Sequence, residues 1–70
     1  MERYKIYTSN GEVIIEIVEH RDDRVVLDEN SSAILKKWFD VWDFAITDGF
    51  LFINLSDGFY GTPEYKLFPA

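Results

Sequence analysis

This chain of 70 residues contains no cysteine and a single histidine, His20. Without cysteine it can form no disulfide, no thiolate zinc site and no cysteine nucleophile, and one histidine cannot build a multi-histidine metal site. Chains of this size stand near the lower limit at which a hydrophobic core alone keeps a domain folded. We therefore expect one domain, residues 1–70, that is held together by its core and binds no metal or other cofactor.

Basic residues are scarce. The chain has 7 Lys and Arg against 13 Asp and Glu, which gives a net charge of -6. Between Trp38 and Tyr65 it has no Lys or Arg at all. Because an acidic surface repels nucleic acid phosphates and attracts basic groups, we expect no direct nucleic acid binding and a protein partner with a basic surface.

Long apolar runs are also missing. No run approaches the roughly 18 apolar residues that a membrane-spanning helix needs. Residues 1–5 mix charges of both signs and lack the apolar stretch of a secretory signal. The sequence therefore predicts a soluble, cytoplasmic protein without a membrane partner.

Aromatic side chains are abundant, and they gather in the second half of the chain. Ten of the twelve aromatic residues lie between positions 38 and 68. Rings of this kind fill small cores and also anchor protein interfaces. The local pattern assigns Trp38, Trp42, Phe52 and Phe68 to the core. It leaves as exposed rings Phe44, Phe59 and Tyr60.

The stretch 4–18 predicts a β-hairpin, because Asn10-Gly11 is the favoured pair for a two-residue type I′ turn. Pairing across that turn gathers the alternate apolar side chains of both strands on one face. It also sets Ile6 opposite Ile15, and it sets Lys5 opposite Glu16 as a favourable cross-strand ion pair.

A third strand is predicted at residues 25–27, after the polar turn that contains Asp22 and Asp23. Loops of two and of three residues would turn opposite faces of this strand to the core, and both remain open. Residues 28–32 then supply several N-cap candidates, so a helix is expected to begin near Asn30 or Ser32.

Two alternatives describe where that helix ends. In the first, a long amphipathic helix runs to Gly49, with an apolar arc on one side and four charged residues on the other. In the second, the helix ends near residues 39–41, and 42–47 pairs with 50–55 around an Asp48-Gly49 type I′ turn. The long helix is favoured, because its four charged residues all lie on the side opposite the apolar arc.

A strand at 50–55 is common to both alternatives, and a last strand is expected near 65–68. The predicted fold is therefore a small α+β domain. It has an N-terminal β-hairpin or three-stranded antiparallel meander, one amphipathic helix and two to three further strands.

Catalysis is not indicated by any motif. His20 lies among charged turn residues, which is typical of a surface histidine rather than of a hydrolytic triad. No segment has the spacing of a calcium-binding EF-hand loop or the glycines of a phosphate-binding loop. We therefore expect a protein that is not an enzyme.

Binding is the function that the composition favours. Exposed rings next to acids would fit a partner with a basic surface, so the chain is interpreted as a module that antagonises or regulates such a partner, an inhibitor type of role. A nucleic-acid-processing protein would be one such partner. The predicted partner-binding residues are Asp40, Asp43, Phe44, Asp48, Asp57, Phe59 and Tyr60. The alternative is a homo-oligomeric accessory subunit, such as a homodimer, that buries the face of Tyr7, Ile14 and Val18.

Overall fold

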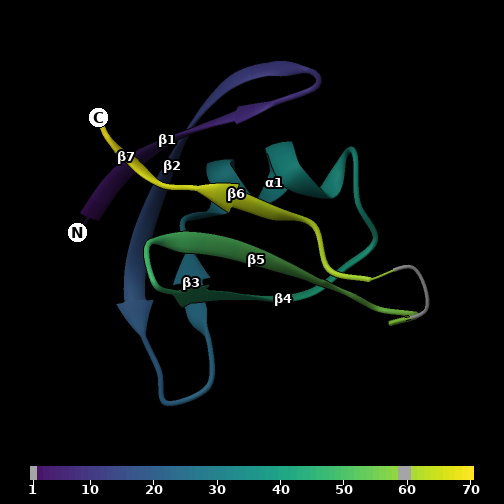
Figure 1. The fold of residues 1–70 in the computed structure, drawn as a ribbon. Helices are drawn as coiled ribbons and strands as arrows, with labels where there is room; N and C mark the ends of the chain where they lie inside the picture. The colour runs from purple at the N-terminus through teal and green to yellow at the C-terminus, as the bar shows by residue number, and fades with distance from the viewer. Residues whose placement is uncertain (1, 59–60) are drawn as a thin grey trace.

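The computed structural model of the chain describes residues 2–58 and 61–70, and nearly all of the regular structure there is β-strand (Figure 1). The elements in chain order are β1 (Glu2–Thr8), β2 (Gly11–His20), β3 (Val25–Leu27), α1 (Glu29–Lys36), β4 (Val41–Thr47), β5 (Phe50–Leu55), β6 (Glu64–Lys66) and β7 (Phe68–Pro69). Of the described residues, 57% are in strands and 12% in the helix. The predicted α+β class is therefore wrong, and four described strands follow the helix instead of two to three.

The strands form one antiparallel sheet in the order β6-β5-β4-β3-β2-β1-β7. Strands β6 and β7 are separated only by Leu67, yet they pair with opposite edges of the sheet. The C-terminal segment thus bridges the two edges and nearly closes the sheet into a barrel. Figure 1 shows that β4 and β5 run across the direction of β2 and β3. The barrel is therefore two antiparallel layers, β1-β2-β3 and β4-β5-β6, packed at a steep crossing.

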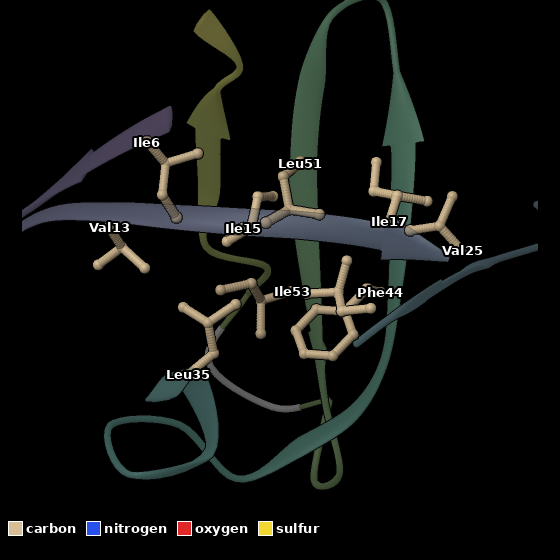
Figure 2. Packing of buried hydrophobic residues seen from close by; sticks show 10 residues of the cluster. Ile6, Val13, Ile15, Ile17, Val25, Leu35, Phe44, Leu51 and Ile53 are labelled. Atoms are coloured by element: carbon tan, nitrogen blue, oxygen red, sulfur yellow. The ribbon is translucent and has the colours of Figure 1, made fainter. Parts of the chain in front are cut away.

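The core lies between these layers and is almost entirely aliphatic (Figure 2). Its buried apolar residues are Ile6, Val13, Ile15, Ile17, Val25, Leu27, Leu35, Phe44, Leu51 and Ile53. In Figure 2 the ring of Phe44 lies beside Ile53, and Leu35 reaches the same cluster from α1. Every strand from β1 to β5 contributes to this cluster, which is why alternate positions on each strand are apolar.

The aromatic residues are placed almost opposite to the prediction. Phe44, expected at the surface, is only 5% exposed. Trp42, expected in the core, is 75% exposed, and Trp38 and Phe68 are each 37% exposed. Phe52 is partly buried on β5. The core assignments of Trp42, Trp38 and Phe68 were therefore wrong, and small aliphatic side chains stabilise the barrel instead.

The predicted N-terminal hairpin is confirmed, with a register that differs by two positions. Thr8 pairs with Gly11, and Ile6 pairs with Val13 instead of Ile15. Because side chains alternate with a period of two, a shift of two leaves each residue on its predicted face. The hydroxyl of Thr8 donates to the Gly11 carbonyl at 2.9 Å and accepts from the Asn10 amide at 3.1 Å, which fixes the turn one residue earlier than predicted.

The same register change alters the ion pairs on the outer face. Arg3 now lies opposite Glu16 and contacts it at 2.5 Å. Lys5 contacts Glu12 at 3.5 Å. The predicted Lys5–Glu16 pair is therefore replaced by two pairs.

The β2–β3 connection is the shorter of the two loops considered, because the Arg21 amide donates to the Arg24 carbonyl at 2.8 Å across two residues. A register shift at Val18 then interrupts the β2–β3 pairing. Because of this shift, the face of β3 that carries Val25 and Leu27 points to the core, and both residues are buried.

Helix α1 begins where β3 stops, and it continues the contact with β2. The Asp28 amide donates to the Glu16 carbonyl at 2.9 Å, and the Glu16 amide donates to the buried Ser31 hydroxyl at 3.0 Å. The Asp28 side chain caps the helix by accepting from the Ser31 amide at 2.9 Å. Hydrogen bonds from the hydroxyl and then from the amide of Ser31 lower the pKa of Asp28.

The long-helix prediction is wrong, because α1 ends at Lys36 and residues 41–47 form β4. Asp48 and Gly49 have φ values of 52° and 80°, which are the left-handed values that a type I′ hairpin requires. Pairing with β5 overrides the helical periodicity of the same residues. Within residues 2–58 and 61–70, no helix is long and apolar enough to cross a membrane.

Candidate functional site

The two layers of the barrel meet along two seams of unequal closure. The closed seam lies between β5 and β1 and is filled by residues 64–69, which pair with β5 through three positions and with β1 through two. The amide of Leu67 adds a hydrogen bond to the Gly49 carbonyl at 2.9 Å. The open seam lies between β3 and β4, where Val25 and Phe44 form the single pairing.

Two shallow hollows flank that single pairing. The first encloses about 290 Å³ and lies between β3, α1 and the beginning of β4. It is lined by Arg21, Arg24, Val25, Val26, Leu27, Ser32, Lys36, Val41, Trp42, Asp43 and Phe44. The second encloses about 230 Å³ between residues 20–25 and residues 45–47. We call the two hollows together the furrow. It runs along β4 on both sides of the Val25–Phe44 pairing.

The main chain of β4 has an incompletely paired edge in this furrow. In a two-residue hairpin the flanking residues, here Thr47 and Phe50, exchange both hydrogen bonds, and every second pair along the ladder repeats this pattern. The main-chain groups of the intervening residues therefore point toward β3. Between the turn and the bulge these residues are Ile46 and Phe44; Phe44 has its partner in Val25, whereas Ile46 has none in the β3–β4 ladder.

Trp42 projects beside this edge because of a β-bulge. Val41 pairs with Leu55 and Asp43 pairs with Asn54, so Trp42 is the extra residue between two consecutive pairs. Val41 packs against the core, while Trp42 turns outward. At 75% exposure it is the most exposed large apolar side chain in the described part of the chain.

The furrow has walls of opposite charge. On the β3 and α1 side lie three bases, Arg21, Arg24 and Lys36. The first two already contact nearby acids, since Arg21 lies 3.0 Å from Glu19 on β2 and Arg24 lies 3.2 Å from Asp23 in the loop.

The β4 wall is acidic. The Asp43 carboxylate accepts a hydrogen bond from the Asn54 side-chain amide at 2.6 Å, a neutral partner that positions the carboxylate without cancelling its charge. Asp40 is exposed just before β4 begins. This wall therefore offers negative charge beside Trp42.

The structure gathers only part of the predicted binding set. The carbonyl of Asp40 accepts from the Ser56 amide at 2.9 Å, which brings Asp40 close to the turn that holds Asp57, and Asp43 is near on β4. Asp48 lies at the opposite end of the β4–β5 hairpin, away from this group. Phe44 is buried, so its predicted role as an exposed anchor is wrong.

The two other predicted anchors, Phe59 and Tyr60, lie outside the described residues. Sequence reasoning missed Trp42 as a surface residue. Trp42 and Phe44 are two positions apart, so simple alternation puts them on one face, and only the bulge separates them. A bulge leaves no mark in hydrophobic periodicity.

Among the described residues, Glu2, Tyr4 and His20 form a candidate group for proton transfer at the end of the barrel where β1 begins. The Tyr4 hydroxyl donates to one oxygen of Glu2 at 2.8 Å, and His20 contacts the other oxygen. The hydrogen bonds from Tyr4 and then His20 lower the pKa of Glu2, and donation to Glu2 raises the pKa of Tyr4. Both shifts move the pKa values away from neutral pH, whereas a general acid or base should have a pKa near neutral.

Metal binding has no candidate cluster, since residues 2–58 and 61–70 contain no group of three or more His, Cys, Asp or Glu placed to hold an ion. Comparisons of the chain with protein-family models, curated proteins and solved structures found no match. Function is therefore inferred from the geometry and charge of the open seam.

Proposed function

We propose that this protein is a non-enzymatic binding module that holds an extended segment of a partner protein in the open seam, with Trp42 as the anchor. The observation that carries this proposal is the position of Trp42. It is 75% exposed and lies at the bulge of β4, next to the strand edge that pairs with β3 only at Phe44. A binding segment would cover the indole and supply partners for the strand edge in a single step.

Two physical arguments support this choice of site. Tryptophan is among the residues that most often carry the binding energy of protein interfaces, because it buries a large rigid surface. An incompletely paired strand edge is a ready template for main-chain hydrogen bonds with an extended peptide. At the other seam the C-terminal segment covers part of both edges, because β6 pairs with β5 and β7 pairs with β1.

The charge of the β4 wall favours a partner segment that carries Lys or Arg. Two of the three bases on the opposite wall, Arg21 and Arg24, are engaged by Glu19 and Asp23, whereas Asp43 has a neutral partner. Asp40 adds a second acid on the same side, and it is exposed. By covering a basic surface, the module would antagonise whatever else that surface of the partner binds, which is the inhibitor type of role expected from the composition.

The proposal is tested by selecting ligands from a library of random linear peptides displayed on phage, with the wild-type protein as bait. The selected peptides should be enriched in Lys and Arg. They should bind Trp42→Ala about tenfold or more weakly, which corresponds to about 1.4 kcal/mol. Asp43→Asn, which keeps the shape of the side chain, should weaken binding more at low salt than at high salt.

A matched control uses the other tryptophan. Trp38→Phe leaves Trp42 as the single tryptophan, so its fluorescence reports directly on the furrow. This variant should bind the selected peptides normally, and its emission should shift when they bind. Peptides that bind Trp42→Ala as well as the wild type, with no change in Trp42 emission, would overturn the proposal.

A further inference from the structure

The outer face of β1, β2 and β7 carries a second exposed apolar group. Tyr7 is 56% exposed, Ile14 is 40% exposed and Phe68 is 37% exposed. Lys5 pairs with Ile14 on one side and with Phe68 on the other, so Ile14, Lys5 and Phe68 form one row across three strands. Tyr7 lies two residues further along β1 and pairs with Glu12. The rings of Tyr7 and Phe68 meet edge to face, with centroids 5.4 Å apart. We call the group of Tyr7, Ile14 and Phe68 the Tyr7 face.

The charges around the Tyr7 face differ from those of the rest of the chain. The surrounding residues are three bases and two acids, whereas the whole chain has a net charge of -6. These residues are Arg3, Lys5, Lys66, Glu12 and Glu16. The ammonium group of Lys66 lies 5.3 Å from the centre of the Phe68 ring, which places this base at the apolar group itself. The Tyr7 face is thus weakly positive on an acidic molecule.

We infer that the Tyr7 face is a self-association surface and that its occupant is a second copy of this chain. Two copies of an acidic protein repel one another through most of their surfaces, and the repulsion is least where the local charge is of opposite sign to the net charge. The face also holds bases and acids side by side, as in the pairs Arg3–Glu16 and Lys5–Glu12. A two-fold arrangement can set the acids of one copy against the bases of the other.

The open seam does not compete for this role. Its β4 wall lies within the segment 38–65, which has acids and no Lys or Arg, so two such walls would repel each other. The Tyr7 face belongs to the other layer of the barrel, on β1 and β2. The two surfaces can therefore act independently, and a dimer would present two open seams.

Val18 provides a matched control. It is 46% exposed on β2, slightly more than Ile14, but it lies four residues further along the strand, at the register shift opposite β3. Four residues of strand span about 13 Å, so Val18 lies beyond the row that Lys5 joins. The same substitution at the two positions should therefore separate a specific surface from general apolar exposure.

The experiment is sedimentation equilibrium of the full chain over a range of concentrations. The wild type should form a dimer that persists at high salt, because apolar burial is not weakened by salt. Ile14→Glu should weaken the dimer by about tenfold or more, equal to about 1.4 kcal/mol. Val18→Glu and Trp42→Ala should dimerise like the wild type.

Thermal melting of both glutamate variants checks that each remains folded. A wild type that stays monomeric at every concentration would overturn the inference. So would an Ile14→Glu variant that dimerises normally, or a Val18→Glu variant that loses the dimer to the same extent. Should Ile14→Glu fail to fold, Phe68→Ser on the short β7 strand tests the same face.

Discussion

The closed seam and the open seam join the same two layers of one barrel, but different parts of the chain cross them. A continuous C-terminal segment crosses the closed seam and pairs with β5 and β1, while Leu67 packs against the core from its middle. The open seam has only the pairing of Val25 with Phe44. Closure removes strand edges. The open seam leaves the edge of β4 incompletely paired near the exposed Trp42, and this is where we propose the binding site.

The largest effect should come from removing the closed seam. A variant that lacks residues 64–70 loses β6, β7 and the side chains of Tyr65 and Leu67 that pack against the core. Strand β5 and strand β1 then become free edges of a small sheet, which cannot stay folded with so little buried surface. We expect loss of the cooperative thermal transition measured by circular dichroism. A truncated protein that melts like the full chain would contradict the role of this segment.

The next largest effect should come from the core residue of the open seam. Phe44 is 5% exposed and forms the one β3–β4 pairing. Phe44→Ala leaves a cavity in a core of ten buried apolar residues and should lower the free energy of unfolding by about 3 to 5 kcal/mol. Urea denaturation measures this difference. Phe44→Leu, which keeps most of the volume, should lose much less.

A much smaller effect on stability is expected two positions away. Because Trp42 is 75% exposed, Trp42→Ala should change the free energy of unfolding by no more than about 0.5 kcal/mol. The same urea experiment applies, and the variant should still lose peptide binding. If Trp42→Ala were as destabilising as Phe44→Ala, then Trp42 would be part of the core and the open seam would have no exposed anchor.

The smallest effect concerns pH and the cap of α1, the helix that borders the open seam. Hydrogen bonds from Ser31 lower the pKa of Asp28 below its ordinary value of 3.8. For a lowered pKa, the stabilising contribution is complete above the ordinary value and is lost as the pH falls through the lowered value. Unfolding midpoints measured from pH 6 downward should therefore decline for the wild type below that ordinary value.

Asp28→Asn is the control for this prediction. Asparagine caps helices as well as aspartate but does not titrate in this range. The variant should keep its stability at neutral pH, and the step that Asp28 contributes should be missing from its acid profile. An unchanged profile would show that the Asp28 cap is not the titrating group.

Local rules predicted those parts of the fold that depend on neighbours in sequence. The Asn10-Gly11 region does turn the first hairpin, and the two-position shift preserved its faces. The Asp48-Gly49 turn was recognised, although only in the less favoured alternative. Asp28 was among the cap candidates, and it is the cap.

The rest depends on contacts between distant residues, which a single sequence does not display. Residues 34–46 satisfy a helical period and, from Trp42 on, a strand period as well, and pairing with β5 decides between them. Closure of the barrel depends on Leu67 bridging two edges. At the site, the structure brings Asp40 and Asp43 close to the turn that holds Asp57, and their role in binding stays a prediction. The bulge at Trp42 exchanged the predicted roles of Trp42 and Phe44, because it rotates one side chain outward while the other stays inside.

Residue-resolved amide hydrogen exchange of the free protein tests the difference between the seams most directly. At the closed seam, the Ile53 amide donates to the Pro63 carbonyl at 2.9 Å and the Leu67 amide donates to the Gly49 carbonyl at 2.9 Å. These two amides should exchange slowly, near the limit set by global unfolding. The amide of Ile46, which points toward β3 and has no partner in the β3–β4 ladder, should exchange far faster. If Ile46 were protected as strongly as Ile53, the seam would be closed and the site proposed for it would not exist.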